Sequence, residues 1–150
     1  MTMARSLLDV KTIFMNDDNC FDYLEVTRWP DVVHCLKCGG GNVSRIITNE
    51  TTRERFSKKL GKVVEVRVPA RRLHQCNRPE CRHQFSATTG TLFNDTHLPL
   101  RTWFQAIALI ANAKEGISAK QMERDLGVHY RTAWFLNHRI REAMRSAPPE

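Results

Sequence analysis

Two pairs of closely spaced cysteines constrain this chain more than any other feature. Cys35 and Cys38 enclose two residues, and Cys76 and Cys81 enclose four. Each pair can place two thiolates on one ion from a single tight turn, and two such turns complete a tetrahedral site. The glycines at 39–41 give the backbone after the first pair the freedom to double back. The pattern predicts a structural Zn²⁺ with four thiolate ligands and a small β ribbon around it.

Other interpretations of the cysteines stay open at this point. Disulfides or buried thiols occur at this density in small secreted proteins, but we expect no secretory signal in the first eight residues, and the cysteines number five. Cys20 lies one helical turn before Leu24, where a small core residue is the simpler interpretation. A histidine could also replace one thiolate, because three histidines lie near the paired cysteines: His34, His74 and His83.

The charge is positive overall and unevenly distributed. The 150 residues carry a net charge of +7, yet residues 1–34 hold three Lys/Arg and six Asp/Glu. Residues 35–98 hold twelve and five, and residues 99–150 hold eight and five. The positive field therefore belongs to the expected ribbon and the segment after it, and such a field attracts polyanions. No apolar run approaches the ~20 residues of a membrane span, so we expect a cytoplasmic protein without a membrane partner.

The chain reads as an α+β protein with a β zinc ribbon between helical segments. We expect a helical brace over residues 1–30, with a helix capped by Asn16 or Asp17. Residues 31–93 form the ribbon, with predicted strands at 43–48, 63–68 and 71–75. A basic loop at 53–62 either contacts phosphate or forms a solvated hairpin tip. Residues 94–145 form a helical unit, and residues 146–150 a tail.

Two short helices around a glycine turn stand out near the C-terminus. An apolar helix follows Leu100 and is expected to end at Gly116. In Ile117–Met122, Ser118 is a predicted N-cap and Gln121 its capping-box partner, and Gly127 separates this helix from one at about 129–143. This order is typical of a helix-turn-helix.

The last helix has a predicted core side and a predicted DNA-facing side. Val128, Ala133, Leu136 and Ile140 fall on one side and should be buried. The N-terminal residues of a recognition helix reach base edges, while neighbouring side chains hold phosphate. Arg131 could instead be solvated, and the aromatic residues could pack on the adjacent helix. The candidate DNA-binding residues are His129, Tyr130, Arg131, Thr132, Trp134 and His138.

Several motifs in this order resemble one protein family. They are Arg28-Trp-Pro30 before the first cysteine pair, Gln84–Phe93, His97–Trp103 and Leu126–Phe135 followed by His138–Glu142. This combination resembles the N-terminal region of zinc-ribbon transposases of bacterial insertion sequences, the group allied to Merlin transposons. The resemblance implies binding of terminal inverted repeats by the ribbon and the helix-turn-helix. The family's catalytic RNase H-like domain, with its acidic triad, is not expected in these residues, and we nominate no catalytic residue.

Two departures and two rival functions accompany this resemblance. The second cysteine pair is wider than the family's usual Cys-x-x-Cys, and the stretch between the pairs is long. We expect a bacterial, cytoplasmic, non-enzymatic protein that binds double-stranded DNA, with a catalytic transposase domain or subunit as a further partner. It could be a truncated copy, a split subunit or a fragment. The alternatives are a free-standing transcription regulator and a zinc-braced protein-interaction module.

Overall fold

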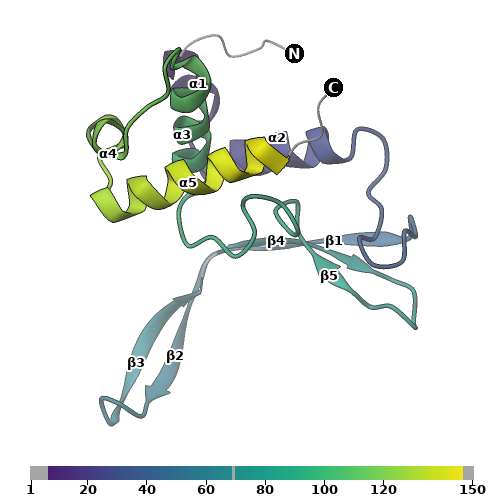
Figure 1. The fold of residues 1–150 in the computed structure, drawn as a ribbon. Coiled ribbons are helices and arrows are strands. Elements are labelled where there is room, and N and C mark those ends of the chain that lie inside the picture. The colour runs from purple at the N-terminus through teal and green to yellow at the C-terminus, as the bar shows by residue number, and fades with distance from the viewer. Residues whose placement is uncertain (1–6, 69, 147–150) are drawn as a thin grey trace. The chain divides into compact units, whose positions relative to one another are not determined.

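The computed structural model describes residues 7–68 and 70–146 and shows an α+β protein, as predicted (Figure 1). The expected tail at 147–150 and the first six residues of the brace lie outside the described residues. The helices are α1 (Leu7–Ile13), α2 (Asp17–Arg28), α3 (Leu100–Asn112), α4 (Ala119–Leu126) and α5 (Tyr130–Ser146). The strands are β1 (Val43–Thr48), β2 (Thr51–Ser57), β3 (Lys62–Val68), β4 (Arg71–Cys76) and β5 (Gln84–Phe85).

The chain forms two compact units, each built from different secondary structure. Residues 29–87 form a ribbon unit, which contains all five strands of the described chain. The segments before and after it, described over 7–28 and 88–146, together form a helical unit. The N-terminal helices, the expected brace over residues 1–30, share this unit with the C-terminal ones, and the ribbon unit ends at residue 87.

Aromatic packing explains why the N-terminal helices join the helical unit. The Phe14 ring lies 4.4 Å from that of Phe104 on α3, and the Tyr23 ring lies 5.7 Å from the same ring, measured between centroids. Asp17 at the start of α2 accepts a hydrogen bond of 3.1 Å from the backbone N–H of Arg101. Cys20 is fully buried in this core, as predicted for a small core residue. These contacts join segments that are about 80 residues apart in the sequence.

Local sequence signals set most helix ends in this unit. The Asn16 side chain accepts the N–H of Asn19 at 2.8 Å, so it caps α2 as predicted. Ser118 caps α4 by accepting the N–H of Gln121 at 3.1 Å. The Gln121 side chain, expected to complete a capping box, instead contacts side chains of its own helix. α3 ends at Asn112 rather than Gly116, because the following Ala113 is already extended, with φ −84° and ψ 110°.

The ribbon unit contains a small antiparallel sheet and a separate hairpin (Figure 1). In the sheet, β4 lies between β1 and β5, and β1 pairs with β4 from Val43 opposite Cys76 to Thr48 opposite Arg71. The hairpin pairs β2 with β3, from Thr51 opposite Val68 to Ser57 opposite Lys62. The expected basic loop at 53–62 is therefore mostly strand, and only the turn between the two strands matches the prediction. The sequence prediction of strands depended on alternation of apolar and polar residues. An exposed two-stranded hairpin does not need this alternation, so the strand at 51–57 was not predicted.

Candidate metal centre and nucleic-acid interface

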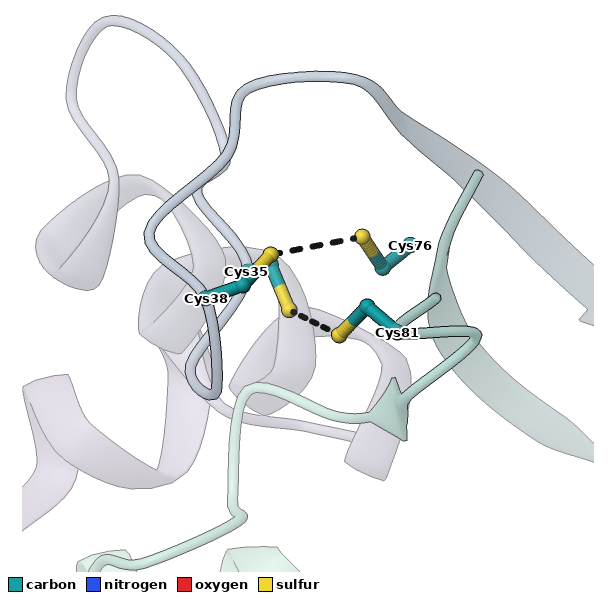
Figure 2. A group of neighbouring side chains, drawn as sticks. All are labelled: Cys35, Cys38, Cys76 and Cys81. Atoms are coloured by element: carbon teal, nitrogen blue, oxygen red, sulfur yellow. Dashed lines mark hydrogen bonds between the residues drawn. The ribbon is translucent and has the colours of Figure 1, made fainter. Parts of the chain in front are cut away.

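Four cysteine sulfurs gather at one end of the small sheet (Figure 2). The Sγ atoms of Cys35, Cys38, Cys76 and Cys81 all lie within 4.8 Å of one another. Cys35 Sγ lies 3.7 Å from Cys81 Sγ, and Cys38 Sγ lies 3.6 Å from Cys76 Sγ. Thiolates bound to zinc at ~2.3 Å in a tetrahedron are about 3.8 Å apart, whereas a disulfide bond is about 2.0 Å long. The cluster fits a structural Zn²⁺, as predicted, and the cysteines are free thiols.

Two tight turns aim these sulfurs at one point. In the first turn, Gly39 donates its N–H to the Cys35 carbonyl at 2.9 Å and has a φ of 67°, which a residue with a Cβ rarely adopts. In the second, the N–H groups of Cys81 and Arg82 donate to the Arg78 carbonyl at 3.0 and 3.1 Å. Arg82, directly after Cys81, is itself left-handed, with a φ of 43°. The four-residue spacing is therefore compatible with the same convergence.

The thiols of this cluster differ in how readily they ionise. Burial raises the pKa of the Cys35 thiol, but hydrogen bonds from the backbone N–H groups of Cys38 and Lys37 outweigh it and lower the pKa to about 7. The N–H of Arg78 lowers the pKa of Cys76, yet burial and the three neighbouring thiols together raise it to about 11. Four thiolates this close repel one another unless a cation lies between them. Zn²⁺ supplies that charge and displaces the protons.

Histidines surround the cluster without joining it. Among the described residues, the group with ligand atoms at metal-binding distance consists of the four cysteines alone. His74 is 3% exposed, and its ring stacks on that of Phe85 at 5.6 Å and meets Trp29 edge-on at 5.3 Å. The His83 ring stacks on Phe85 from 5.9 Å. These histidines act as packing residues beside the turns, and the geometry favours four thiolate ligands.

A second candidate site lies on the outer face of α5. Ala133, Leu136 and Ile140 are fully buried and Val128 is partly buried, as the helical pattern predicted. Asn137 Nδ2 and the Arg141 guanidinium both donate to the Ile117 carbonyl, at 2.8 and 3.0 Å, which ties α5 to the start of α4. The left-handed Gly127, with a φ of 65°, ends α4 and sets the turn between the two helices. The opposite face of α5 is therefore held outward.

The predicted DNA-binding residues mostly lie on this outward face. His129, Arg131 and His138 are exposed, and Thr132 is partly buried. Tyr130 is 45% and Trp134 48% exposed, so neither ring is buried between the helices. The Trp134 ring lies 4.1 Å from that of His138, one helical turn away. Tyr130, Trp134 and His138 line one surface pocket, and Arg131 and Thr132 line another, with the exposed Arg131 cation near the N-terminal end of the helix.

Two residues on this face escaped the sequence interpretation. Phe135 is 43% exposed, and the Arg139 guanidinium lies 5.8 Å from its ring centroid. The helical spacing from Arg131 to Phe135 and Arg139 could have identified them, but a phenylalanine in an apolar pattern reads as core. Together with the 94–98 segment and Trp103 they line an open pocket of about 340 Å³, whose walls also include Arg131 and Thr132.

No described helix is both long and apolar enough to cross a membrane.

Comparison with known proteins gives a coherent result. Residues 15–84 match the transposase zinc-ribbon domain family. This span includes α2 and all four clustered cysteines. The chain is also similar to an uncharacterized protein in the transposable element ISH50 of Halobacterium salinarum, with 23% identity over 143 residues. That alignment covers 95% of this chain but 40% of the relative, so the chain spans less than half of the relative's length. No solved structure matches.

The family match and the geometry agree on the same residues. The matched span begins in the turn before α2 and ends at Gln84, the first residue of β5. Within it lie both tight turns and the strands β1 to β4. Over residues 15–84 the chain is therefore similar to transposase zinc-ribbon domains, and the matched span contains all four clustered cysteines.

Proposed function

We propose that this chain binds duplex DNA at the terminal inverted repeats of a transposable element. In this proposal α4, the Gly127 turn and α5 act as a helix-turn-helix, and α5 enters the major groove. The α5 face that carries Arg131 supports the proposal best, because it is held outward while the opposite face is buried. An α-helix fits the major groove, and residues near the start of a recognition helix reach base edges.

Each residue on this face has a proposed role. Arg131 would donate to guanine or phosphate, since a guanidinium can make two parallel hydrogen bonds. Tyr130 and Trp134 offer exposed rings to sugars and thymine methyl groups, and His129, Thr132 and His138 offer polar contacts to the backbone. The transposase zinc-ribbon match and the relative in ISH50 support a target at transposon ends.

The zinc site would be structural in this function. Cys35, Cys38, Cys76 and Cys81 would fill all four coordination positions of Zn²⁺, which leaves no open position for a substrate. Two-metal strand transfer needs converging carboxylates, and no group of three or more acidic residues gathers at metal-binding distance in the described part of the chain. We therefore propose a binding role, with strand cleavage and joining carried out by a catalytic domain or subunit.

The test is a binding titration with labelled duplexes that carry the inverted repeats flanking the gene, compared with scrambled duplexes. Arg131→Ala should weaken binding to the repeat about tenfold or more, in line with 1–3 kcal/mol for a specific arginine contact, and should reduce selectivity. Arg145→Ala is the matched control, because it removes an exposed arginine from the same helix near its C-terminal end. We expect it to change binding little.

The same titration addresses the alternative functions. Selective binding of the repeats by the isolated chain would suit both a transposase subunit and a regulator that occupies the element's ends. A strand-transfer assay with the catalytic partner, in which this chain either stimulates or blocks joining, would separate these two. Equal, weak binding to both duplexes at all salt concentrations would overturn the proposal in favour of a protein-interaction module.

A further inference from the structure

The hairpin of β2 and β3 is not used by the proposed recognition helix. Its strands pair only with each other, in a sheet distinct from that of β1, β4 and β5. The other described strands of the ribbon unit make no extensive contact with it. The side chains at 51–56 and 58–63 are all exposed. A hairpin without a packing partner is marginally stable in water, so a binding partner on one of its faces would stabilise it.

The hairpin is rich in positive charge. Between residues 51 and 68 the sequence has six Lys/Arg and two Asp/Glu. Lys58 and Lys59 occupy the exposed turn, and Gly61, with a φ of 59°, allows the chain to reverse there. These cations are therefore concentrated on a narrow element of only two paired strands. Such an element suits a polyanion better than a neutral partner.

The two faces of the hairpin differ in charge. Successive side chains of a strand point to opposite faces, and directly paired residues share a face. The register pairs Arg53 with Val66, Arg55 with Val64 and Ser57 with Lys62, so three cations share one face without an acidic residue. The other face carries Glu54 directly opposite Glu65 and Phe56 opposite Val63, with the Thr52–Arg67 pair at its end. We call these the basic face and the acidic face of the hairpin.

We propose that the hairpin is a second DNA-contacting arm, whose basic face lies against the phosphate backbone outside the segment read by α5. The inference rests on the proposed function, because it assigns further contacts to the same duplex. Seven-residue strands are about 20 Å long at ~3.4 Å per residue, so the basic face is long enough to contact several phosphates of a duplex.

Phosphate contact would make the arm insensitive to base sequence. Arg53, Arg55 and Lys62 present guanidinium and ammonium donors on one face, which suits the regularly spaced phosphates of a duplex. The acidic face, with its paired Glu54 and Glu65, would be repelled by the same phosphates and would face away. The helix would then select the sequence and the arm would add affinity on any duplex.

The first test measures the salt dependence of binding. Each phosphate contact contributes about 0.9 to the slope of log affinity against log salt. Arg53→Gln with Arg55→Gln should therefore reduce the slope by about 1.8 on repeat and scrambled duplexes alike. The loss of affinity should be about tenfold larger at 50 mM salt than at 200 mM. Glu54→Gln with Glu65→Gln, on the acidic face of the same strands, should leave the slope unchanged.

A second variant keeps the net charge constant. Thr52→Arg with Arg53→Thr moves one guanidinium from the basic face to the acidic face without changing composition. If the basic face contacts the phosphates, the slope of log affinity against log salt should fall by about 0.9 in this variant. An unchanged slope would mean that only the total charge of the hairpin matters, and it would overturn the facial contact. Zinc content and circular dichroism of each variant confirm that the ribbon is folded.

A deletion separates this inference from the proposed function. Thr48 and Arg71 are directly paired, so residues 49–70 can be replaced by an Asn-Gly turn that leaves the small sheet and all four clustered cysteines in place. Lower affinity with retained repeat selectivity would support the arm and leave α5 as the reader. Unchanged affinity and slope would refute the arm while Arg131→Ala still tests α5. Loss of binding on deletion but not with Arg131→Ala would refute the proposed role of α5 instead.

Discussion

The two units of this protein are held together by different means. The helical unit buries thirteen residues in one cluster, including Trp103, Met122 and Leu136. The corresponding cluster of the ribbon unit has three buried residues, and two of them, Cys35 and Cys76, are thiols of the candidate metal site. Such a small cluster removes little apolar surface from water. The helical unit therefore depends on apolar packing, and the ribbon unit depends on the metal.

The ribbon's few apolar side chains are arranged around the cysteines rather than away from them. The rings of Trp29, His74 and Phe85 lie 5.3–5.8 Å from one another, directly beside the sheet that carries Cys76. Phe85 is buried in one cluster with Cys35 and Cys76, and Trp29 packs against that cluster, whereas Cys38 is exposed. The aromatic cluster and the metal site would therefore form and unfold together.

The largest effect expected is the loss of the ribbon when zinc is removed. Chelation, or Cys76→Ser, should unfold the ribbon unit, since structural zinc contributes about 10–16 kcal/mol in small zinc domains. Trp29 fluorescence, in a variant with Trp103 and Trp134 replaced by Phe, should report the change. Ellipticity at 222 nm should be largely retained, because all the described α-helices lie in the helical unit.

Cys20→Ser is the matched control for this experiment. Cys20 is buried in the core of the helical unit and does not belong to the group of clustered sulfurs. Zinc content should stay near one ion per chain in this variant and fall in Cys76→Ser. Equal zinc content in the two variants would contradict the four-thiolate site.

The next largest effect should come from the core of the helical unit. Leu136→Ala removes a fully buried side chain and should lower the free energy of unfolding by about 2–5 kcal/mol. Phe135→Ala, at the adjacent, 43% exposed position of the same helix, should cost much less. Thermal unfolding followed at 222 nm with zinc bound measures both. A similar cost for the two variants would mean that α5 is not packed by the face described here.

The features predictable from sequence were those encoded by neighbouring residues. The cysteine spacing indicated the metal cluster, and the caps at Asn16 and Ser118 were correct because a side chain and an N–H three residues away decide them. The buried side of α5 followed from the 3.6-residue period. The roles of the DNA-facing residues stay predictions, although their exposure is now known.

The features that sequence could not provide depend on long-range packing or on solvent. The joining of α1 and α2 to the helical unit requires Phe14 to meet Phe104, which no local pattern encodes. Strand β2 was missed because Arg53-Glu-Arg55 has no apolar alternation; pairing with β3, rather than burial, makes it a strand. The early end of α3 was missed because Gly116 is a stronger local signal than Ala113.

The buried thiol of Cys20 gives a pH-dependent prediction for the helical unit. Burial, and to a lesser extent the charge of Asp17, raises the pKa of Cys20 from 9.0 to about 12. Because the folded pKa exceeds the unfolded one, this thiol contributes stability that is complete below pH 9 and is lost as the pH rises toward 12. Denaturation of zinc-bound protein between pH 8 and 11 should show stability falling above pH 9, and the fall should be smaller in Cys20→Ala. An identical pH profile in the two proteins would contradict the shifted pKa.

The smallest effect expected concerns the cap that positions the start of α4. Ser118→Ala removes the acceptor for the Gln121 N–H and should cost about 1 kcal/mol, whereas Ser118→Asn should keep most of the stability. Because α5 is tied to the Ile117 carbonyl just before this cap, loosening α4 should also weaken DNA binding, while the zinc content of the ribbon unit stays constant. A stability loss without any loss of binding would show that α5 keeps its orientation through Asn137 and Arg141 alone. A change in zinc content would show that the two units are coupled more strongly than their separate cores suggest.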